Sequence, residues 1–390
     1  MLKAEIRDKY TVTIGIECHV QLKTKTKLFA AVGNDAREAP PNTLVSHICF
    51  GLPGALPVLN KEALTLASKA AFALGTEPER FSKFVRKHYF YPDLPKGYQI
   101  TQFDEPIIGK GEITIEVDGQ AKKIGITRAH LEEDAGKSTH TEGTDYSTVD
   151  LNRAGTPLLE IVSEPDMHSS AEAKAYAREL YLRMRYADVS YANLYYGNMR
   201  FDVNVSVSTT DELGTRSETK NLNSFKSVER AVEFEVERQI ELLEKGGQVV
   251  QETRGWDDAK QKTISQRSKE NADDYRYMPD PDIPPVLLEE TFVAKIKSEM
   301  PELPDDYRKK FNAMEIDSQV IEDIIAVPST AKLVSRIFDQ SNAEHARRVA
   351  FWTMQPSSDD DPEEATESAY NETQLIALSE LVSGNKLSST

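Results

Sequence analysis

With 390 residues, the chain is long enough to bury a substantial core and to form two or three domains. Its 64 acidic and 47 basic residues give a net charge of −17, which argues against non-specific binding to nucleic acid but not against RNA held at a local basic site. No apolar run could span a bilayer, the N-terminus lacks a signal-peptide core, and two cysteines cannot form a disulfide framework. We therefore expect a cytoplasmic protein that contacts neither membranes nor DNA.

The predicted elements mix strands and helices over about the first 290 residues, and the rest of the chain is mainly helical. Alternating or β-branched runs predict strands at residues 12–22, 112–117, 123–127 and 200–207, and Asp118-Gly119 predicts a two-residue hairpin turn. Periodicity and capping residues predict helices at 61–74, 171–186 and 225–245. The pattern predicts an α+β fold, and the acidic run 357–364 is expected to be a solvated loop between helices.

Residues 86–101 combine cations, tyrosines and prolines in a stretch that fits neither helical nor strand periodicity. We expect a rigid loop that presents Lys87 and the rings of Tyr89 and Tyr91 to an anionic, partly planar ligand. A nucleotide or a nucleic acid meets that description. The alternative is a surface loop that is held in place by its own tyrosines.

Glu17 and His19 lie two residues apart on the predicted strand 12–22, so their side chains project from the same face. A carboxylate beside an imidazole suits a divalent metal or a proton-transfer pair. A surface contact between glutamate and histidine explains the pair equally well.

Three consecutive acids, Glu132, Glu133 and Asp134, form a second cluster. Such a run is costly unless it is solvated or gathered around a cation. Hard oxygen ligands with one histidine favour Mg²⁺ or Mn²⁺ over zinc, which prefers the thiolates that this chain lacks.

The predicted strand 200–207 places Arg200, Asp202 and Asn204 on one face and apolar residues on the other. The polar face is suited to be the wall of a site, and the alternative is a half-exposed strand of an antiparallel sheet. Glu218, shortly before the predicted helix 225–245, adds another carboxylate.

Together these segments resemble the GatB family, which supplies the B component of the tRNA-dependent amidotransferase GatCAB. The resemblance runs from about residue 13 to residue 389. Its most specific stretches are residues 14–22, 51–60, 86–101, 124–137, 149–166, 220–225 and 273–285.

The resemblance implies a cradle domain with a mixed β-sheet over residues 1–290 and an all-α helical domain over 291–390, with the family's C-terminal tail domain absent. It also implies an enzyme that uses ATP and Mg²⁺ to phosphorylate the side-chain carboxylate of Glu-tRNA(Gln) or Asp-tRNA(Asn). Ammonia then displaces the phosphate to form the amide. The GatA subunit, a glutaminase, would release this ammonia from glutamine, and the GatC subunit would clamp GatA to GatB.

The family's functional positions fall on acidic, basic and aromatic residues of this chain. The resemblance implies Mg²⁺ ligands at Glu17, His19, Glu133 and Glu160. It implies catalytic roles for Glu17, His19, Lys87, Glu133, Asp202 and Glu218. For substrate binding it implies Tyr89, and the patterns described above add Tyr91, Arg200 and Asn204.

Some positions depart from the family's pattern. Where many members carry four zinc-binding cysteines, this chain has Ala30, Val32, Ser46 and Cys49, so we expect no structural zinc. Tyr195-Tyr196 stands where two acids are usual, which affects the expected ammonia route or the local pKa values.

Two other functions are compatible with the sequence. The chain could be a catalytically silent subunit that binds tRNA or assembles the same complex, a reading favoured by Tyr195-Tyr196 and the missing tail. The clustered acids weigh against it, because a scaffold does not need them. A Mg²⁺-dependent phosphohydrolase accounts for the carboxylates but not for the tyrosine-rich segment.

Overall fold

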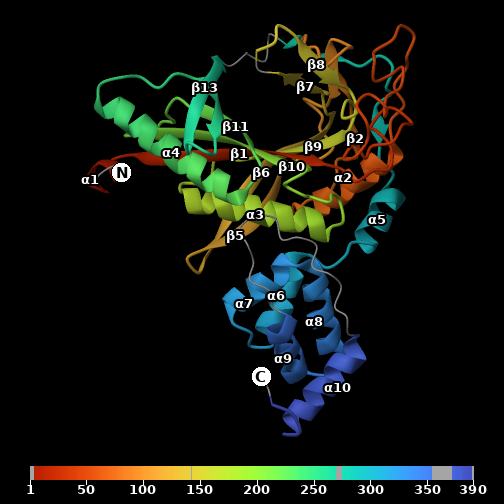
Figure 1. The fold of residues 1–390 in the computed structure, drawn as a ribbon, viewed down its shortest axis with the longest axis vertical. Helices are drawn as coiled ribbons and strands as arrows, with labels where there is room; N and C mark the ends of the chain where they lie inside the picture. Colours follow the sequence, from red (N-terminus) through yellow and green to blue (C-terminus); the bar gives the residue numbers. More distant parts are fainter. Residues whose placement is uncertain (1–3, 142, 269–274, 354–370, 389–390) are drawn as a thin grey trace. The chain divides into compact units, whose positions relative to one another are not determined.

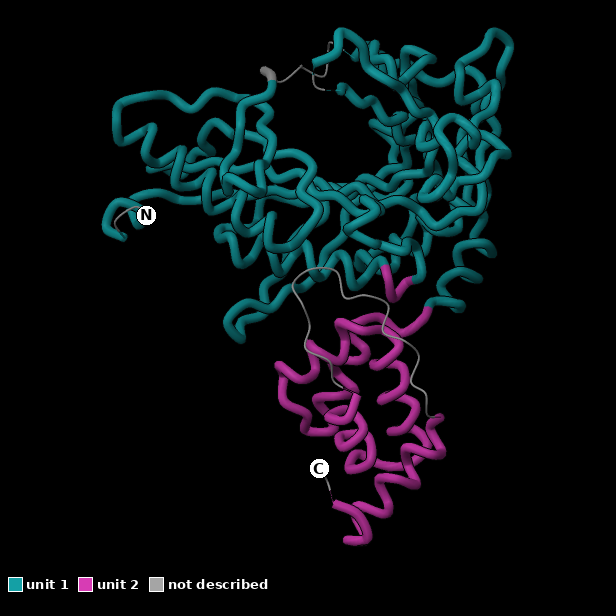
Figure 2. Tube along the Cα trace, viewed as in Figure 1, with its two compact units in different colours: residues 1–184, 188–300 teal, residues 185–187, 301–390 magenta. Residues whose placement is uncertain are grey.

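The computed structural model describes residues 4–141, 143–268, 275–353 and 371–388. The chain forms two compact units, which Figure 2 shows in separate colours: Met1–Met184 with Asp188–Met300, and Arg185–Ala187 with Pro301–Thr390. The fold is mixed α+β, as predicted. The predicted acidic loop 357–364 lies outside the described residues. Within them, no helix is both long and apolar enough to cross a membrane.

The first unit is organised around a mixed sheet of eleven strands in its described part. The strands are β1 Thr11–Gln21, β3 Val85–His88, β4 Tyr98–Thr101, β5 Gly111–Val117, β6 Gln120–Glu133, β9 Pro157–Ser163, β10 Met199–Ser208, β11 Ser217–Leu222, β12 Glu252–Asp257, β13 Lys262–Ser268 and β14 Met278–Pro279. Their order is β13-β12-β11-β10-β1-β9-β6-β4-β3-β14, and β5 pairs with β6. The pairing of β11 with β12 is parallel, and the neighbouring ladders are antiparallel.

Two small sheets complete the β-structure of the described residues. They pair β2 Phe81–Ser82 with β15 Val286–Leu287, and β7 Lys137–His140 with β8 Ser147–Asp150. The first unit also holds the helices α1 Ala4–Arg7, α2 Lys61–Ala73, α3 Ser170–Tyr186, α4 Phe225–Glu244 and α5 Glu290–Ser298. Residues 185 and 186 at the end of α3 belong to the second unit.

The predicted helices form, and their termini have the expected chemistry. Ser224 caps α4 by accepting a hydrogen bond from the backbone N–H of Ser227, and Gly246 follows the helix with a positive φ of 76°. Figure 1 shows α3 and α4 along one face of the sheet, and the rings of Tyr181 and Phe225 join the two helices at 5.3 Å.

β1 separates the core from the face that carries the site. Ile14, Ile16 and Cys18 are fully buried, whereas Glu17 and His19 alternate with them and project to the other side. Because α3 and α4 cover the apolar side, the polar side chains of the sheet are left to line the opposite face.

The hairpin at Asp118-Gly119 is confirmed: both residues have positive φ, 52° and 73°, and join β5 to β6. The prediction of one continuous loop over residues 86–101 is wrong, because its two ends pair as β3 and β4. These strands are too short to show periodicity in the sequence, and tertiary pairing decides their conformation.

Regular structure in the described part of the chain after residue 289 is helical. The helices of the second unit are α6 Pro304–Asn312, α7 Ser318–Ala326, α8 Pro328–Gln340, α9 Ala343–Thr353 and α10 Glu372–Ser383. Phe311, Ile324, Val334 and Val349 are fully buried and form its core. The helix α5 belongs to the first unit, and the proposed boundary after residue 290 stays a prediction.

A buried carboxylate ties α4 to the sheet. Glu235 is fully buried and accepts hydrogen bonds from Ser217 at 2.7 Å, from Arg238 at 2.8 Å and from Thr263, while Arg254 lies 3.0 Å away. Burial opposes ionisation, but these donors outweigh it and lower the pKa of Glu235.

Glu235→Gln is therefore expected to lower the free energy of unfolding by about 3 kcal/mol, because it takes the shared carboxylate away from Arg238 and leaves the buried Arg254 paired with Glu252 alone. Denaturant unfolding at pH 7 measures the change. Since the folded pKa lies below the ordinary value of 4.5, this stabilisation is complete above that pH and disappears as the pH falls through the lowered pKa. Glu241→Gln, at an exposed position of the same helix, serves as the control, and an equal loss there would contradict the account.

Candidate functional site

The polar face of the sheet is hollowed into a cavity of about 480 Å³. Its lining is rich in charged and aromatic side chains drawn from both halves of the first unit. From the predicted site residues, it includes Glu17, His19, Lys87, Tyr89, Glu160 and Glu218. A cavity of this size can hold a nucleotide-sized ligand.

The register of strands β1, β9 and β6 brings three of the cavity residues side by side. His19 on β1 lies opposite Glu160 on β9, and Glu160 lies opposite His130 on β6. Paired residues on neighbouring strands project to the same face, so the two imidazoles flank one carboxylate. Glu132, two residues after His130, projects to that face as well.

These four side chains form a compact cluster of opposite charges. His19 Nε2 lies 3.4 Å from Glu160 Oε2 and 3.8 Å from Glu132 Oε1. His130 Nε2 lies 3.6 Å from Glu160 Oε2 and 3.7 Å from Glu132 Oε2. Its other ring nitrogen, Nδ1, is buried and has no hydrogen-bond partner among the described residues.

The electrostatics of the cluster follow from this packing. Burial alone would lower the pKa of His19, but the hydrogen bond and charge of Glu160 outweigh it and raise the pKa to about 9. Burial alone would raise the pKa of Glu160, but His130 and His19 outweigh it and hold that pKa well below its ordinary value. Burial likewise opposes ionisation of Glu132, but the hydrogen bond of His130 outweighs it and lowers the pKa of Glu132. Both carboxylates are therefore ionised, whereas His19 is protonated at neutral pH and would release that proton on binding a cation.

The cluster fits a hard divalent cation. One ligand atom from each of His19, Glu132 and Glu160 lies within 4.8 Å of the other two. Two carboxylate oxygens with one imidazole nitrogen are a donor set for Mg²⁺ or Mn²⁺, which prefer oxygen and leave positions for water and phosphate.

A second acidic group lies beside the first along β1, β10 and β11. Glu17 accepts a hydrogen bond from Asn204 Nδ2 at 3.1 Å. Lys220 Nζ lies 3.3 Å from Asp202 Oδ2 and 3.4 Å from Glu218 Oε1. Burial, followed by the charges of Glu160, Glu218 and Asp202, raises the pKa of Glu17, which makes this carboxylate a better proton acceptor near neutral pH.

Another part of the cavity lining combines one cation with aromatic rings. Lys87 Nζ lies 4.6 Å from the centroid of the Tyr275 ring, and Tyr89 packs edge-on against the same ring at 6.3 Å. Burial alone would lower the pKa of Lys87, but the charge of Glu132 outweighs it and raises the pKa, so Lys87 remains an ammonium group. Phe103 and Tyr277 stack at 4.2 Å in the same lining.

The structure places Glu133 away from the cluster of His19, Glu132 and Glu160, so the predicted set of metal ligands is not brought together. Glu133 faces the other side of β6, where it accepts hydrogen bonds from Lys96 and from the backbone N–H of Ile100 at 3.0 Å. Adjacent residues of a strand project to opposite faces, so Glu132 and Glu133 cannot both reach the cavity. Of these two neighbours, Glu132 is the one that lies beside His19 and Glu160.

Three of the predicted substrate-binding residues, Tyr91, Arg200 and Asn204, lie outside the cavity lining, as does the predicted catalytic residue Asp202. Arg200 donates to Asp134 Oδ2 at 3.2 Å, and Tyr91 is 47% exposed on the segment between β3 and β4. His130 was not predicted from the sequence as a member of the cluster. The sequence does contain a pattern that indicates it. His130 and Glu132 are two residues apart with the apolar Leu131 between them, so on a strand both polar side chains project to the same face.

Three of the four positions considered for zinc, Ala30, Ser46 and Cys49, lie close together, and only Cys49 offers a thiol. Ala30 and Cys49 line the same small cavity, and Ser46 Oγ lies 3.6 Å from Cys49 Sγ. A single thiol cannot supply the four ligands of a structural zinc site. We expect elemental analysis of the purified protein to find far less than one zinc per chain, and a stoichiometric zinc that survives dialysis against a chelator would contradict this.

Comparison with known protein families gives one match that covers most of the chain. Residues 12–294 match the model of the GatB/GatE catalytic domain. The matched region includes every residue of the cavity that is named above.

Similar proteins are found in several bacteria. The B subunit of the aspartyl/glutamyl-tRNA(Asn/Gln) amidotransferase of Thioalkalivibrio sulfidiphilus is 46% identical over 386 residues, which is 97% of this chain and 81% of that protein. The protein of the same name from Alkalilimnicola ehrlichii is 53% identical over 306 residues, 78% of this chain and 64% of that protein. That of Caldicellulosiruptor saccharolyticus is 43% identical over 396 residues, 98% of this chain and 81% of that protein.

Proposed function

Because the chain belongs to the GatB family, we propose that it is the subunit of an aspartyl/glutamyl-tRNA amidotransferase that activates and amidates the misacylated tRNA. The substrates would be Glu-tRNA(Gln), Asp-tRNA(Asn) or both, and the products Gln-tRNA(Gln) and Asn-tRNA(Asn). The GatA subunit would supply ammonia from glutamine, which makes the complex a ligase that forms a carbon–nitrogen bond, and the GatC subunit would hold the complex together.

The chemistry requires activation of a carboxylate. An oxygen of the side-chain carboxylate attacks the γ-phosphorus of ATP, and ADP leaves. Ammonia then attacks the acyl carbon, the C–O bond to phosphate breaks, and inorganic phosphate leaves with that carboxylate oxygen. One proton from the attacking ammonia must be accepted.

The residues of the cavity suit these steps. His19, Glu132 and Glu160 would hold a Mg²⁺ ion, which supplies charge neutralisation for the phosphates when it is bound. Lys87 adds a fixed positive charge that stabilises the negative charge of the transferring phosphoryl group. Glu17, whose pKa is raised, is placed to accept the proton from ammonia, and Asn204 orients its carboxylate through the 3.1 Å hydrogen bond.

The aromatic wall favours an aminoacylated RNA end and a nucleotide as ligands. Tyr89, Tyr275 and the stacked pair Phe103–Tyr277 offer ring faces and edges beside the ammonium of Lys87. This local arrangement matters because the net charge of −17 provides no general attraction for RNA. The observation that carries the proposal is that the cluster of His19, Glu132 and Glu160 lines the same cavity as Lys87 and these rings.

The proposal is tested by amide formation with the assembled complex. The chain, its GatA and GatC subunits, ATP and Mg²⁺ are mixed with Glu-tRNA(Gln) or Asp-tRNA(Asn), and either glutamine or ammonium chloride is added as the nitrogen source. We expect amide from both sources on at least one tRNA. Amide from ammonium chloride alone would place a fault in delivery from GatA, while leaving the proposed chemistry intact.

The alternative of a catalytically silent subunit gives a different result in the same assay. It predicts tRNA binding without amide from either nitrogen source. A phosphohydrolase would instead cleave ATP at the same rate with and without misacylated tRNA. Either result would overturn the proposal.

A further inference from the structure

Lys27 is a buried lysine that lacks the partner such a residue usually has. It is 1% exposed, yet its Nζ lies within ion-pair distance of no carboxylate in the described part of the chain. It donates to the carbonyl oxygen of Leu151 at 3.3 Å and to the sulfur of Cys49 at 3.4 Å. Lysines are rarely buried this fully without a carboxylate partner, so the position of this amine beside the thiol of Cys49 needs an explanation.

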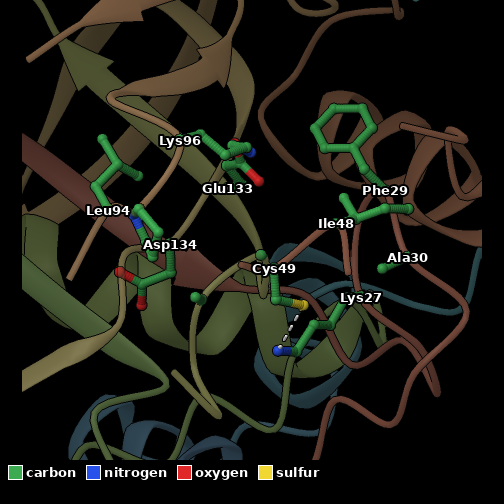
Figure 3. A pocket seen from close by; sticks show the side chains of 12 residues that line it. Lys27, Phe29, Ala30, Ile48, Cys49, Leu94, Lys96, Glu133 and Asp134 are labelled. Carbon is green, nitrogen blue, oxygen red and sulfur yellow. Dashed lines mark hydrogen bonds and ion pairs between the residues drawn. The ribbon is translucent and has the colours of Figure 1, made fainter. Parts of the chain in front are cut away.

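The pair is held in place by the backbone around it. Lys27 follows β1, and the backbone N–H of Leu28 donates to the carbonyl of Gly155 at 2.9 Å. The side chain of Asn60 donates to the carbonyl of Lys27 at 3.2 Å and fastens the far end of the segment that carries Cys49. Figure 3 shows the nitrogen of Lys27 directed at the sulfur of Cys49.

A small cavity adjoins both residues. Its volume is about 10 Å³, and Lys27, Cys49, Lys96 and Glu133 are part of its lining. This is about the space of one water molecule. A small oxidant that enters by local opening can therefore meet the sulfur in a site that already contains an amine.

We propose that Lys27 and Cys49 form a redox-sensitive modification site, in which hydrogen peroxide converts the contact into a covalent sulfur–nitrogen bond. The thiol sulfur attacks the peroxide oxygen, so the O–O bond breaks, water leaves and Cys49 becomes a sulfenic acid. The amine of Lys27 then attacks this sulfur, and the S–N bond forms as a second water leaves. One hydrogen peroxide is reduced, the sulfur is oxidised by two electrons, and the two residues together lose two hydrogen atoms.

The environment favours the second step. Only the neutral amine is a nucleophile, and burial lowers the pKa of Lys27. The sulfenic acid would form 3.4 Å from this amine, so the reaction needs no large movement of the chain. Thiols attack sulfur–nitrogen bonds in the same way as disulfides, so a dithiol reductant should restore both residues. The inference does not depend on the proposed function.

Cys18 provides an internal control. It is fully buried in β1, and burial raises its pKa well above the ordinary value, which disfavours the reactive thiolate. No lysine faces it among the contacts described for this residue. It should therefore stay reduced under conditions that modify Cys49.

The test treats the folded protein with hydrogen peroxide, blocks the remaining thiols after unfolding, and maps tryptic peptides by mass spectrometry. Because trypsin does not cleave after a modified lysine, the linked product consists of residues 26–37 joined to residues 38–61. We expect its mass to be lower than the sum of the two peptides by two hydrogen atoms. Reduction with dithiothreitol should return free Cys49 and cleavage after Lys27.

Two variants distinguish formation of the sulfur–nitrogen bond from oxidation of Cys49 alone. Lys27→Met should give no linked peptide and should accumulate a sulfenic acid at Cys49 that dimedone traps. Cys49→Ser should leave Lys27 cleavable after peroxide. The inference is overturned if the wild-type protein oxidises Cys49 only to the sulfinic or sulfonic acid with Lys27 still cleavable, or if Cys18 is modified before Cys49.

Discussion

Glu132→Gln is expected to weaken Mn²⁺ or Mg²⁺ binding by at least about tenfold and to slow amide formation by roughly 100-fold or more. The glutamine keeps the shape of the side chain but removes one of the two anionic ligands in the cluster of His19, Glu132 and Glu160. Binding of Mn²⁺ can be followed by electron paramagnetic resonance. Turnover is measured separately, with the complex saturated with ATP and misacylated tRNA.

Glu133→Gln is the matched control for metal binding. Its carboxylate contacts Lys96 and the N–H of Ile100 on the other face of β6, so Mn²⁺ affinity should change by less than about twofold even where the lost ion pair lowers stability or turnover. The affinity for Mn²⁺ distinguishes the role of Glu132 from that of Glu133, whereas activity could fall in both variants. Weakened metal binding in Glu133→Gln with normal binding in Glu132→Gln would restore the assignment made from the sequence.

Lys87→Ala is expected to lower kcat by roughly 100-fold or more while changing the KM for misacylated tRNA only slightly. The ammonium is held between the Tyr275 ring and the charges of Glu132 and Glu160, where it neutralises charge that builds up during phosphoryl transfer. Steady-state kinetics of the complex give both constants.

Lys87→Arg keeps the charge but spreads it over a larger planar group, so it should recover part of the lost kcat. A raised KM with unchanged kcat in Lys87→Ala would place the residue in substrate binding instead. Equal kinetics of the alanine and arginine variants would show that the charge at this position is not used.

Features set by local sequence were the ones that could be predicted. Strand β1 follows from the alternation of polar and apolar residues, and helix α4 follows from helical spacing of apolar residues after a serine cap. The turn at Asp118-Gly119 follows from the ability of both residues to adopt a positive φ, which both have in the structure. The pairing of β3 with β4 was not predictable in the same way, because four-residue strands carry no usable period and are stabilised by neighbours distant in sequence.

The site shows a similar division. Glu17 and His19 could be paired from their spacing on one strand. The neighbours of His19 in the folded protein depend on strand order. Strands β9 and β6 bring Glu160, His130 and Glu132 beside it from more than a hundred residues away in the sequence. To identify Glu132 as the residue beside His19, one must know which alternate residues of β6 face the cavity. Three acids in a row do not show this, because each of them is equally polar.

The contact between Lys27 and Cys49 is tertiary as well. They lie 22 positions apart in the sequence, and nothing in the intervening segment predicts that it folds back on itself. The sequence shows a single cysteine where a metal site would need four, and only the structure shows that a buried amine stands beside it.

The central claim, that the side-chain carboxylate is activated by phosphorylation in this cavity, is tested most directly by following one oxygen atom. Glu-tRNA(Gln) or Asp-tRNA(Asn) is prepared with oxygen-18 in the side-chain carboxylate and converted to the amide by the complex with ATP and ammonia. The account predicts that each amide formed releases one inorganic phosphate that carries the label. Amide formation with unlabelled phosphate, or with the label in AMP, would contradict it.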